Sequence, residues 1–135
     1  MATWLLKSDP DTYSLDDLER DKKTTWDGVR NNQALIYLRQ MKKGDLALIY
    51  HSGDDKNVVG LAEVTSAAYA DPKLDDPKLV VVDLRFKKRS AKPVTLAQIK
   101  ADRDFAGLQL IRQSRLSVMP VPEAMCKKLL TMGGL

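Results

Sequence analysis

The 135 residues, 44% of them hydrophobic, suffice for one compact domain with a core and exclude a wholly disordered chain. The single cysteine excludes an intrachain disulfide, and one histidine beside one cysteine excludes a structural zinc site, which takes four such ligands. A formal net charge of +4 favours an anionic partner, and the short apolar runs predict no membrane span.

Residues 3–7 predict a short strand, with Trp4 and Leu6 on the same face. A helix is expected over residues 15–20, because Ser14 has the side chain to cap its first N–H groups.

The next segment, residues 24–31, is interpreted as a loop that carries Trp26. A second helix follows, capped by Asn31 or Asn32 and stabilised by an apolar stripe at helical spacing. Gly44 has the conformational freedom to end this helix.

Two apolar segments, residues 45–51 and 58–67, flank a polar turn at 52–57 and predict a hairpin. After a loop rich in proline and aspartate at 71–77, residues 79–87 alternate apolar and polar side chains. This alternation predicts a strand with one buried and one hydrated face.

The C-terminal part combines short helices with one strand. Residues 95–98 have the form of a capping box that opens a short helix, and residues 105–113 predict a broken helix. Residues 115–119 predict a strand, and Pro122 suits the first turn of a closing helix.

Several short strands interrupted by short helices predict an α+β fold, in which a small closed β-barrel protects the strand edges. We expect a single domain over residues 1–135, because the chain has no linker or internal repeat. The N-terminus lacks the basic start and apolar stretch of a secretory signal, so we expect a cytoplasmic protein, with the nucleus as the alternative if the source is eukaryotic. A monomer without metal or organic cofactor is the simplest expectation.

Residues 4–14 (WLLKSDPDTYS) closely resemble the opening of EVE-domain proteins. Further matches follow in the family's order at residues 26–31, 44–45, 50–52, 59–60 and 115–118. Asp9 stands where the family more often has glutamate. The resemblance implies a PUA-like barrel, shared with the YTH readers of methylated adenine, and the recognition of modified bases in DNA or RNA.

A reader of modified bases needs an aromatic stacking surface and a few groups that bond to the altered base edge. The resemblance implies that Trp26 and Tyr50 supply the aromatic walls, beside a loop in which Gly28 lets the backbone approach the base. The predicted pocket consists of Ser8, Trp26, Gly28, Val29, Arg30, Asn31, Tyr50, His51, Ser52 and Ser114.

Four of these residues also have a purely structural interpretation. Trp26 is alternatively a buried anchor, and Tyr50 alternatively packs in the core. Asn31 alternatively serves only as a helix cap, and His51 as an ordinary surface histidine. If Trp26 is a loop residue over a pocket, its removal is expected to leave the stability nearly unchanged.

The basic residues are mostly scattered pairs, which is typical of a solvated surface. The cluster Lys87, Lys88 and Arg89 at the end of a predicted strand is the best candidate for phosphate contacts.

Two other classes of function compete with a nucleic-acid reader. An enzyme acting on modified nucleic acid is disfavoured, because the chain lacks a nucleophile elbow, a phosphate-binding glycine loop and the deaminase signature. A protein–protein adaptor with a vestigial pocket is the other alternative.

Overall fold

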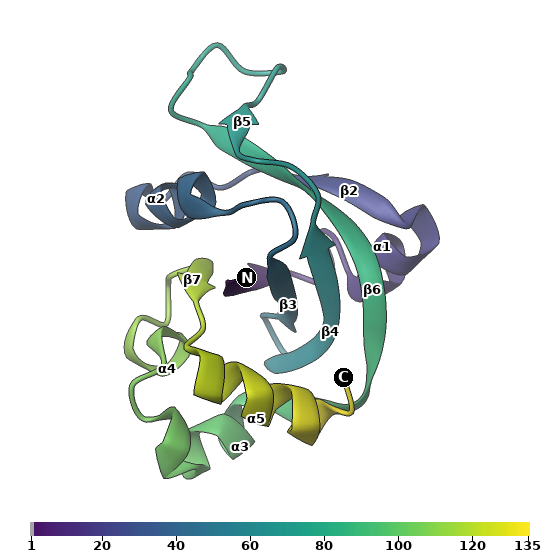
Figure 1. The fold of residues 1–135 in the computed structure, drawn as a ribbon, viewed down its shortest axis with the longest axis vertical. Helices are drawn as coiled ribbons and strands as arrows, with labels where there is room; N and C mark the ends of the chain where they lie inside the picture. The colour runs from purple at the N-terminus through teal and green to yellow at the C-terminus, as the bar shows by residue number, and fades with distance from the viewer. Residues whose placement is uncertain (1) are drawn as a thin grey trace.

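The computed structural model describes residues 2–135, in which strands and helices alternate at first, four strands then follow one another, and helices dominate the C-terminal part (Figure 1). In chain order the elements are β1 (Thr3–Ser8), α1 (Leu15–Asp21), β2 (Lys23–Trp26), α2 (Asn32–Gln40), β3 (Leu46–His51), β4 (Asn57–Val64), β5 (Tyr69–Ala70), β6 (Val80–Thr95), α3 (Leu96–Ala101), the 3-10 turn η1 (Arg103–Phe105), α4 (Gln109–Arg112), β7 (Val118–Pro120) and α5 (Glu123–Gly133).

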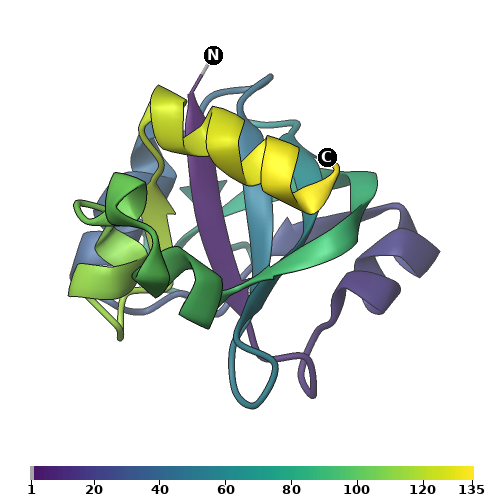
Figure 2. The same cartoon turned by 90° about the horizontal axis from the view of Figure 1, so that it is seen from below.

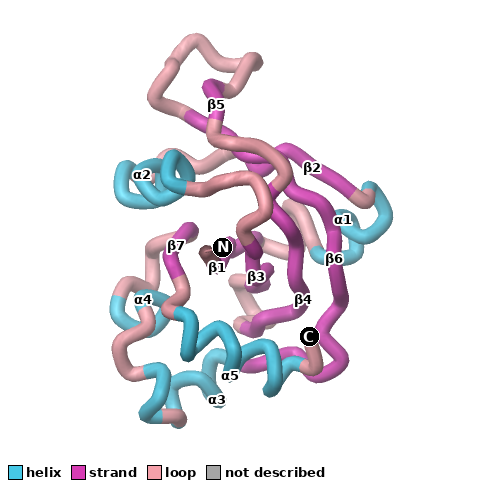
Figure 3. The backbone as a smooth tube through the Cα atoms, viewed as in Figure 1, coloured by secondary structure: helices cyan, strands magenta, loops and turns pink. Residues whose placement is uncertain are grey.

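Seven strands form one curled sheet in the order β2-β6-β4-β3-β1-β7, with β5 paired to β6 outside this path (Figure 3). All pairs are antiparallel except β1 with β3, which lie parallel. Within residues 2–135 no pairing joins β2 to β7, so the sheet is a half-barrel rather than the closed barrel that was expected.

The helices cover the sheet edges that the half-barrel leaves open. Helix α1 packs against β2 and β6, and α2 packs beside β7. Figure 2 shows α5 (yellow) crossing the strands, and it packs against β6. This coverage explains why Leu5 of β1 is as fully buried as Leu6, although the two side chains point to opposite faces.

Several local predictions are confirmed. Ser14 accepts a hydrogen bond from the N–H of Asp17 and caps α1, and Thr95 caps α3 in the same way. Asn31 caps α2 by accepting from the N–H of Ala34. The hairpin is present as β3 and β4, and the broken helix as η1 and α4.

Other predictions are wrong at particular points. Residues 23–26 form β2 and not a loop, because they pair with β6. Helix α2 ends at Gln40, and Gly44 takes φ +97° in the turn before β3. Strand β6 continues to Thr95, beyond the predicted end at 87, because β4 supplies partners for its polar half.

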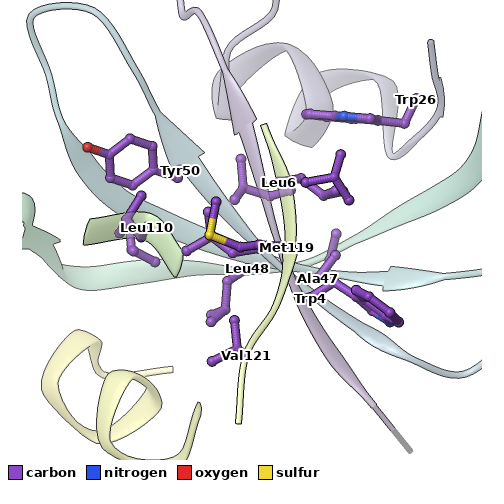
Figure 4. Packing of buried hydrophobic residues seen from close by; sticks show 14 of the residues in the cluster. Trp4, Leu6, Trp26, Ala47, Leu48, Tyr50, Leu110, Met119 and Val121 are labelled. Carbon is purple, nitrogen blue, oxygen red and sulfur yellow. The ribbon is translucent and has the colours of Figure 1, made fainter. Parts of the chain in front are cut away.

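The core fills the inside of the curled sheet (Figure 4). At one end of it, the Trp4 Nε1–H donates to the Asp45 carboxylate at 3.0 Å, which satisfies a buried donor.

No helix within residues 2–135 has the length and apolarity needed to cross a bilayer. In the same residues no group of three or more His, Cys, Asp or Glu side chains is arranged to hold a metal ion.

Candidate functional site

A cleft of about 710 Å³, which we call the first cleft, opens between the end of β1 with the segment after it and β2 with the loop after it. Its volume lies in the range of about 300–1,000 Å³ that is typical of small-molecule sites. It is lined by Lys7, Ser8, Asp9, Thr12, Tyr13, Thr24, Thr25, Trp26, Asp27, Gly28, Val29, Arg30, Lys73 and Ser117.

Trp26 combines the two interpretations that the sequence left open. It lies at the end of β2, where it is only 7% exposed and belongs to the core, yet it also lines the first cleft. Its ring contacts Tyr13 edge-on, with the ring centroids 6.4 Å apart. In the described part of the chain its Nε1–H has no acceptor, whereas that of Trp4 has one. Trp26 is therefore both a core residue and a wall with a free donor.

Lys7 and Ser8 close the β1 side of the first cleft. The Ser8 Oγ–H donates to the Tyr13 carbonyl at 2.6 Å, which fixes the segment that carries Tyr13. The Lys7 Nζ donates to the Ser114 carbonyl at 2.8 Å, and burial lowers the pKa of this amine. Residue-by-residue sequence reasoning missed Lys7 and Tyr13, although both lie in the motif at 4–14.

The loop after β2 forms the opposite wall. Gly28 takes φ +78°, a conformation that side-chain-bearing residues rarely adopt, and a Cβ there would meet only open space. A ligand can therefore approach this backbone closely. Val29 is buried beneath the loop and Arg30 is exposed at the rim.

Five predicted pocket residues do not line the first cleft: Asn31, Tyr50, His51, Ser52 and Ser114. Tyr50 is 3% exposed and lies in the core, apart from Trp26, with Leu6 between them in Figure 4. It contacts the cleft only indirectly, because the Lys7 Nζ lies 5.7 Å from its ring centroid. Ser52 donates its backbone N–H to the Ser8 carbonyl at 2.9 Å.

His51 is engaged in a structural role. Its Nε2 accepts from the backbone N–H of Leu15 at 2.9 Å, at the start of α1. The Nδ1 therefore carries the proton and donates to Asp55, at 3.1 Å. The ring is buried, and each of its two nitrogens forms a hydrogen bond within the protein.

Asn31 and Ser114 lie in a separate, smaller cleft of about 340 Å³, which we call the second cleft. Its lining residues come from the start of α2, from the last residue of α4 and from the segment between α4 and β7. They are Asn31, Gln33, Arg112, Gln113, Ser114, Arg115 and Leu116.

The predicted phosphate cluster lies outside both clefts, on β6. Arg89 contacts the carboxylates of Asp16 and Glu19 on α1, so its charge is already compensated. Lys87 and Lys88 are exposed on the same strand.

Residues 2–132 match the family model described as the EVE domain. Human thymocyte nuclear protein 1 is 30% identical to the chain, in an alignment that covers 89% of the chain and 68% of that relative. The NMR structure of a protein from Rhodopseudomonas palustris is 40% identical in sequence and superposes with a TM-score of 0.93. The match covers 99% of this chain and 94% of the R. palustris chain.

A further solved structure is the human THYN1 protein in complex with DNA containing 5-methylcytosine. It is 28% identical in sequence and has a TM-score of 0.91, and the match covers 100% of this chain and 99% of the human chain. This overlap confirms the predicted α+β, PUA-like barrel fold with surrounding short helices, in which the sheet of this chain is curled into a half-barrel.

Proposed function

Because the chain belongs to the EVE domain family, we propose that it is a nucleic-acid-binding domain that recognises a modified nucleobase in the first cleft. In this proposal residues 1–135 act as one domain, bind the base without metal or cofactor, and leave it chemically unchanged.

The observation that carries the proposal is the first cleft itself, with an aromatic wall and a free donor. Stacking of a base on an aromatic side chain is worth about 1–3 kcal/mol, and flipping a base out of a duplex costs a few kcal/mol. An unpaired or single-stranded base is therefore the easier ligand. The complex of the human THYN1 protein with 5-methylcytosine DNA supports the same class of partner.

The polar groups of the first cleft suit an altered base edge. Trp26 Nε1 and Lys7 Nζ are donors, and the carboxylates of Asp9 and Asp27 are acceptors for exocyclic amino groups. Arg30 at the rim is placed to contact a phosphate. We propose these five residues as the base-binding set, in place of Tyr50, His51 and Ser52.

We expect the chain to bind at least one modified oligonucleotide about tenfold more tightly than its unmodified counterpart, a difference of about 1.4 kcal/mol. Fluorescence anisotropy with single-stranded DNA and RNA, carrying modified cytosine, adenine or guanine, measures this ratio. Equal affinity across the panel contradicts the proposal. Mass spectrometry of the bound oligonucleotide should show no change in mass, and turnover would indicate an enzyme.

Lys7→Met is expected to weaken oligonucleotide binding by about 1 kcal/mol or more, because it removes the amine from the cleft wall. Stability should change little, since the flexible methionine chain fills the space of the lysine stem. Lys100→Met, on the exposed face of α3, is the matched control, because Lys100 lines neither cleft. If the two variants bind equally well, Lys7 is not a ligand contact.

A further inference from the structure

The two clefts are neighbours that share a wall. Arg30 lines the first cleft and Asn31 the second, while Ser117 lines the first and Leu116 the second. Consecutive Cα atoms are about 3.8 Å apart, so one residue's width separates the clefts at both places. The bond from the Lys7 Nζ to the Ser114 carbonyl crosses the same wall.

The charges of the two clefts differ. The first cleft contains carboxylates beside its basic residues, whereas the second contains Arg112 and Arg115 and no carboxylate. Within residues 2–135 neither of these arginines forms a salt bridge. Both side chains are exposed, so their donors are available to a ligand.

Three of the other six arginines form salt bridges with carboxylates within residues 2–135. Arg20 contacts Asp17 and Asp21, and Arg85 contacts Glu63. The second cleft is distinguished by two arginines that line one concave surface with no carboxylate beside them, which favours an anion as its ligand. The amide side chains of Asn31, Gln33 and Gln113 add hydrogen-bonding groups but no negative charge.

We propose that the second cleft binds the backbone phosphate of the nucleotide next to the one whose base occupies the first cleft. This inference rests on the proposed function. Guanidinium groups bind phosphate oxygens in a bidentate manner, and such contacts fix the position of the strand without reading its sequence. The second cleft thus supplies affinity and the direction of the strand, and the first cleft supplies selectivity for the modification.

The test compares the wild type, the double variant Arg112→Gln/Arg115→Gln and a double control, Arg20→Gln/Arg103→Gln. The control removes the same charge from residues that line neither cleft. The probes are single-stranded DNA with one 5-methylcytosine, the same strand with cytosine, and the free nucleoside 5-methyldeoxycytidine. Affinities are measured over a series of salt concentrations.

The double variant is expected to bind both strands about tenfold more weakly and to keep their affinity ratio and its affinity for the nucleoside. Its plot of log affinity against log salt should be shallower by about 0.7, since one phosphate contact on a single strand contributes about that much. Wild-type affinity and slope in the double variant, or equal losses in the control, would overturn the inference.

The two proposals can fail separately. If the wild type binds both strands equally while the double variant binds both more weakly, selective recognition of 5-methylcytosine is refuted but the phosphate site is supported. Selective wild-type binding that the double variant retains in full refutes only the phosphate site. Wild-type protein that binds neither strand overturns both proposals.

Discussion

Trp26→Ala is expected to weaken both folding and binding, because the side chain belongs to the core and to the cleft wall. Removing a large buried aromatic ring costs about 3–5 kcal/mol of unfolding free energy. Loss of the stacking surface removes a further 1–3 kcal/mol or so from base binding. Urea unfolding and oligonucleotide anisotropy on the same purified protein measure the two effects. Unchanged stability was expected for a tryptophan in a loop. Because Trp26 lies instead on β2 and is only 7% exposed, we now expect its removal to destabilise the fold.

A matched pair of variants separates the two roles of Trp26. Trp26→Leu and Trp4→Leu both replace a buried tryptophan with a smaller apolar side chain, but Trp4 lines neither cleft. Both variants should lose stability, and only Trp26→Leu should lose affinity once the folded fraction is taken into account. If both bind equally well in their folded state, Trp26 is a core residue only.

Asp45→Ala is expected to destabilise the fold by about 3 kcal/mol or more, which is large for a single polar residue. The carboxylate is 5% exposed and accepts from the Trp4 Nε1–H at 3.0 Å, the Lys42 N–H at 3.0 Å and the Ala2 N–H at 3.1 Å. Alanine leaves the buried Trp4 donor without a partner. Urea unfolding near neutral pH measures the loss, and a change below 1 kcal/mol or so would contradict the expectation.

The same carboxylate makes stability depend on pH in the acid range. Burial raises the pKa of Asp45, but the three hydrogen bonds outweigh it and hold the pKa below the ordinary value of 3.8. Between these two pKa values the unfolded chain binds more protons than the folded one. The stabilisation is therefore present above about pH 3.8 and is lost as the pH falls through the lower folded value.

Asp45→Asn should flatten this acid dependence, because the amide does not titrate. Some dependence remains through partly exposed carboxylates such as Asp17, whose pKa is lowered by a hydrogen bond from the Ser14 N–H. Unfolding of the wild type and the variant at several pH values, from neutral to about 3, gives the comparison. Parallel curves would show that Asp45 does not contribute to the acid dependence.

The amino-acid sequence by itself determined the elements that depend on local signals. Ser14 and Thr95 cap helices because their side chains bond to N–H groups three residues away. The hairpin of β3 and β4 follows from two apolar segments around a polar turn. The motif at residues 26–31 likewise pointed to the segment that forms one wall of the first cleft.

Only the tertiary structure decided which of the motif residues face the cleft. Strand β2 and the second half of β6 exist because distant strands satisfy their backbone groups, and neither has a strong pattern of its own. The parallel pairing of β1 with β3 buries Tyr50 and brings Lys7 to the cleft.

The tertiary structure also decided which arginine side chains are free to bind an anionic ligand. Arg89 looks free in the cluster at 87–89, but the fold places it against Asp16 and Glu19, which are 73 and 70 residues away in the chain. Arg112 and Arg115 belong to no charge cluster in the sequence and so do not indicate a binding site there. In the structure they line one concave surface that has no carboxylate. Composition counts charges, whereas contacts between distant segments determine which of them remain free to bind a ligand.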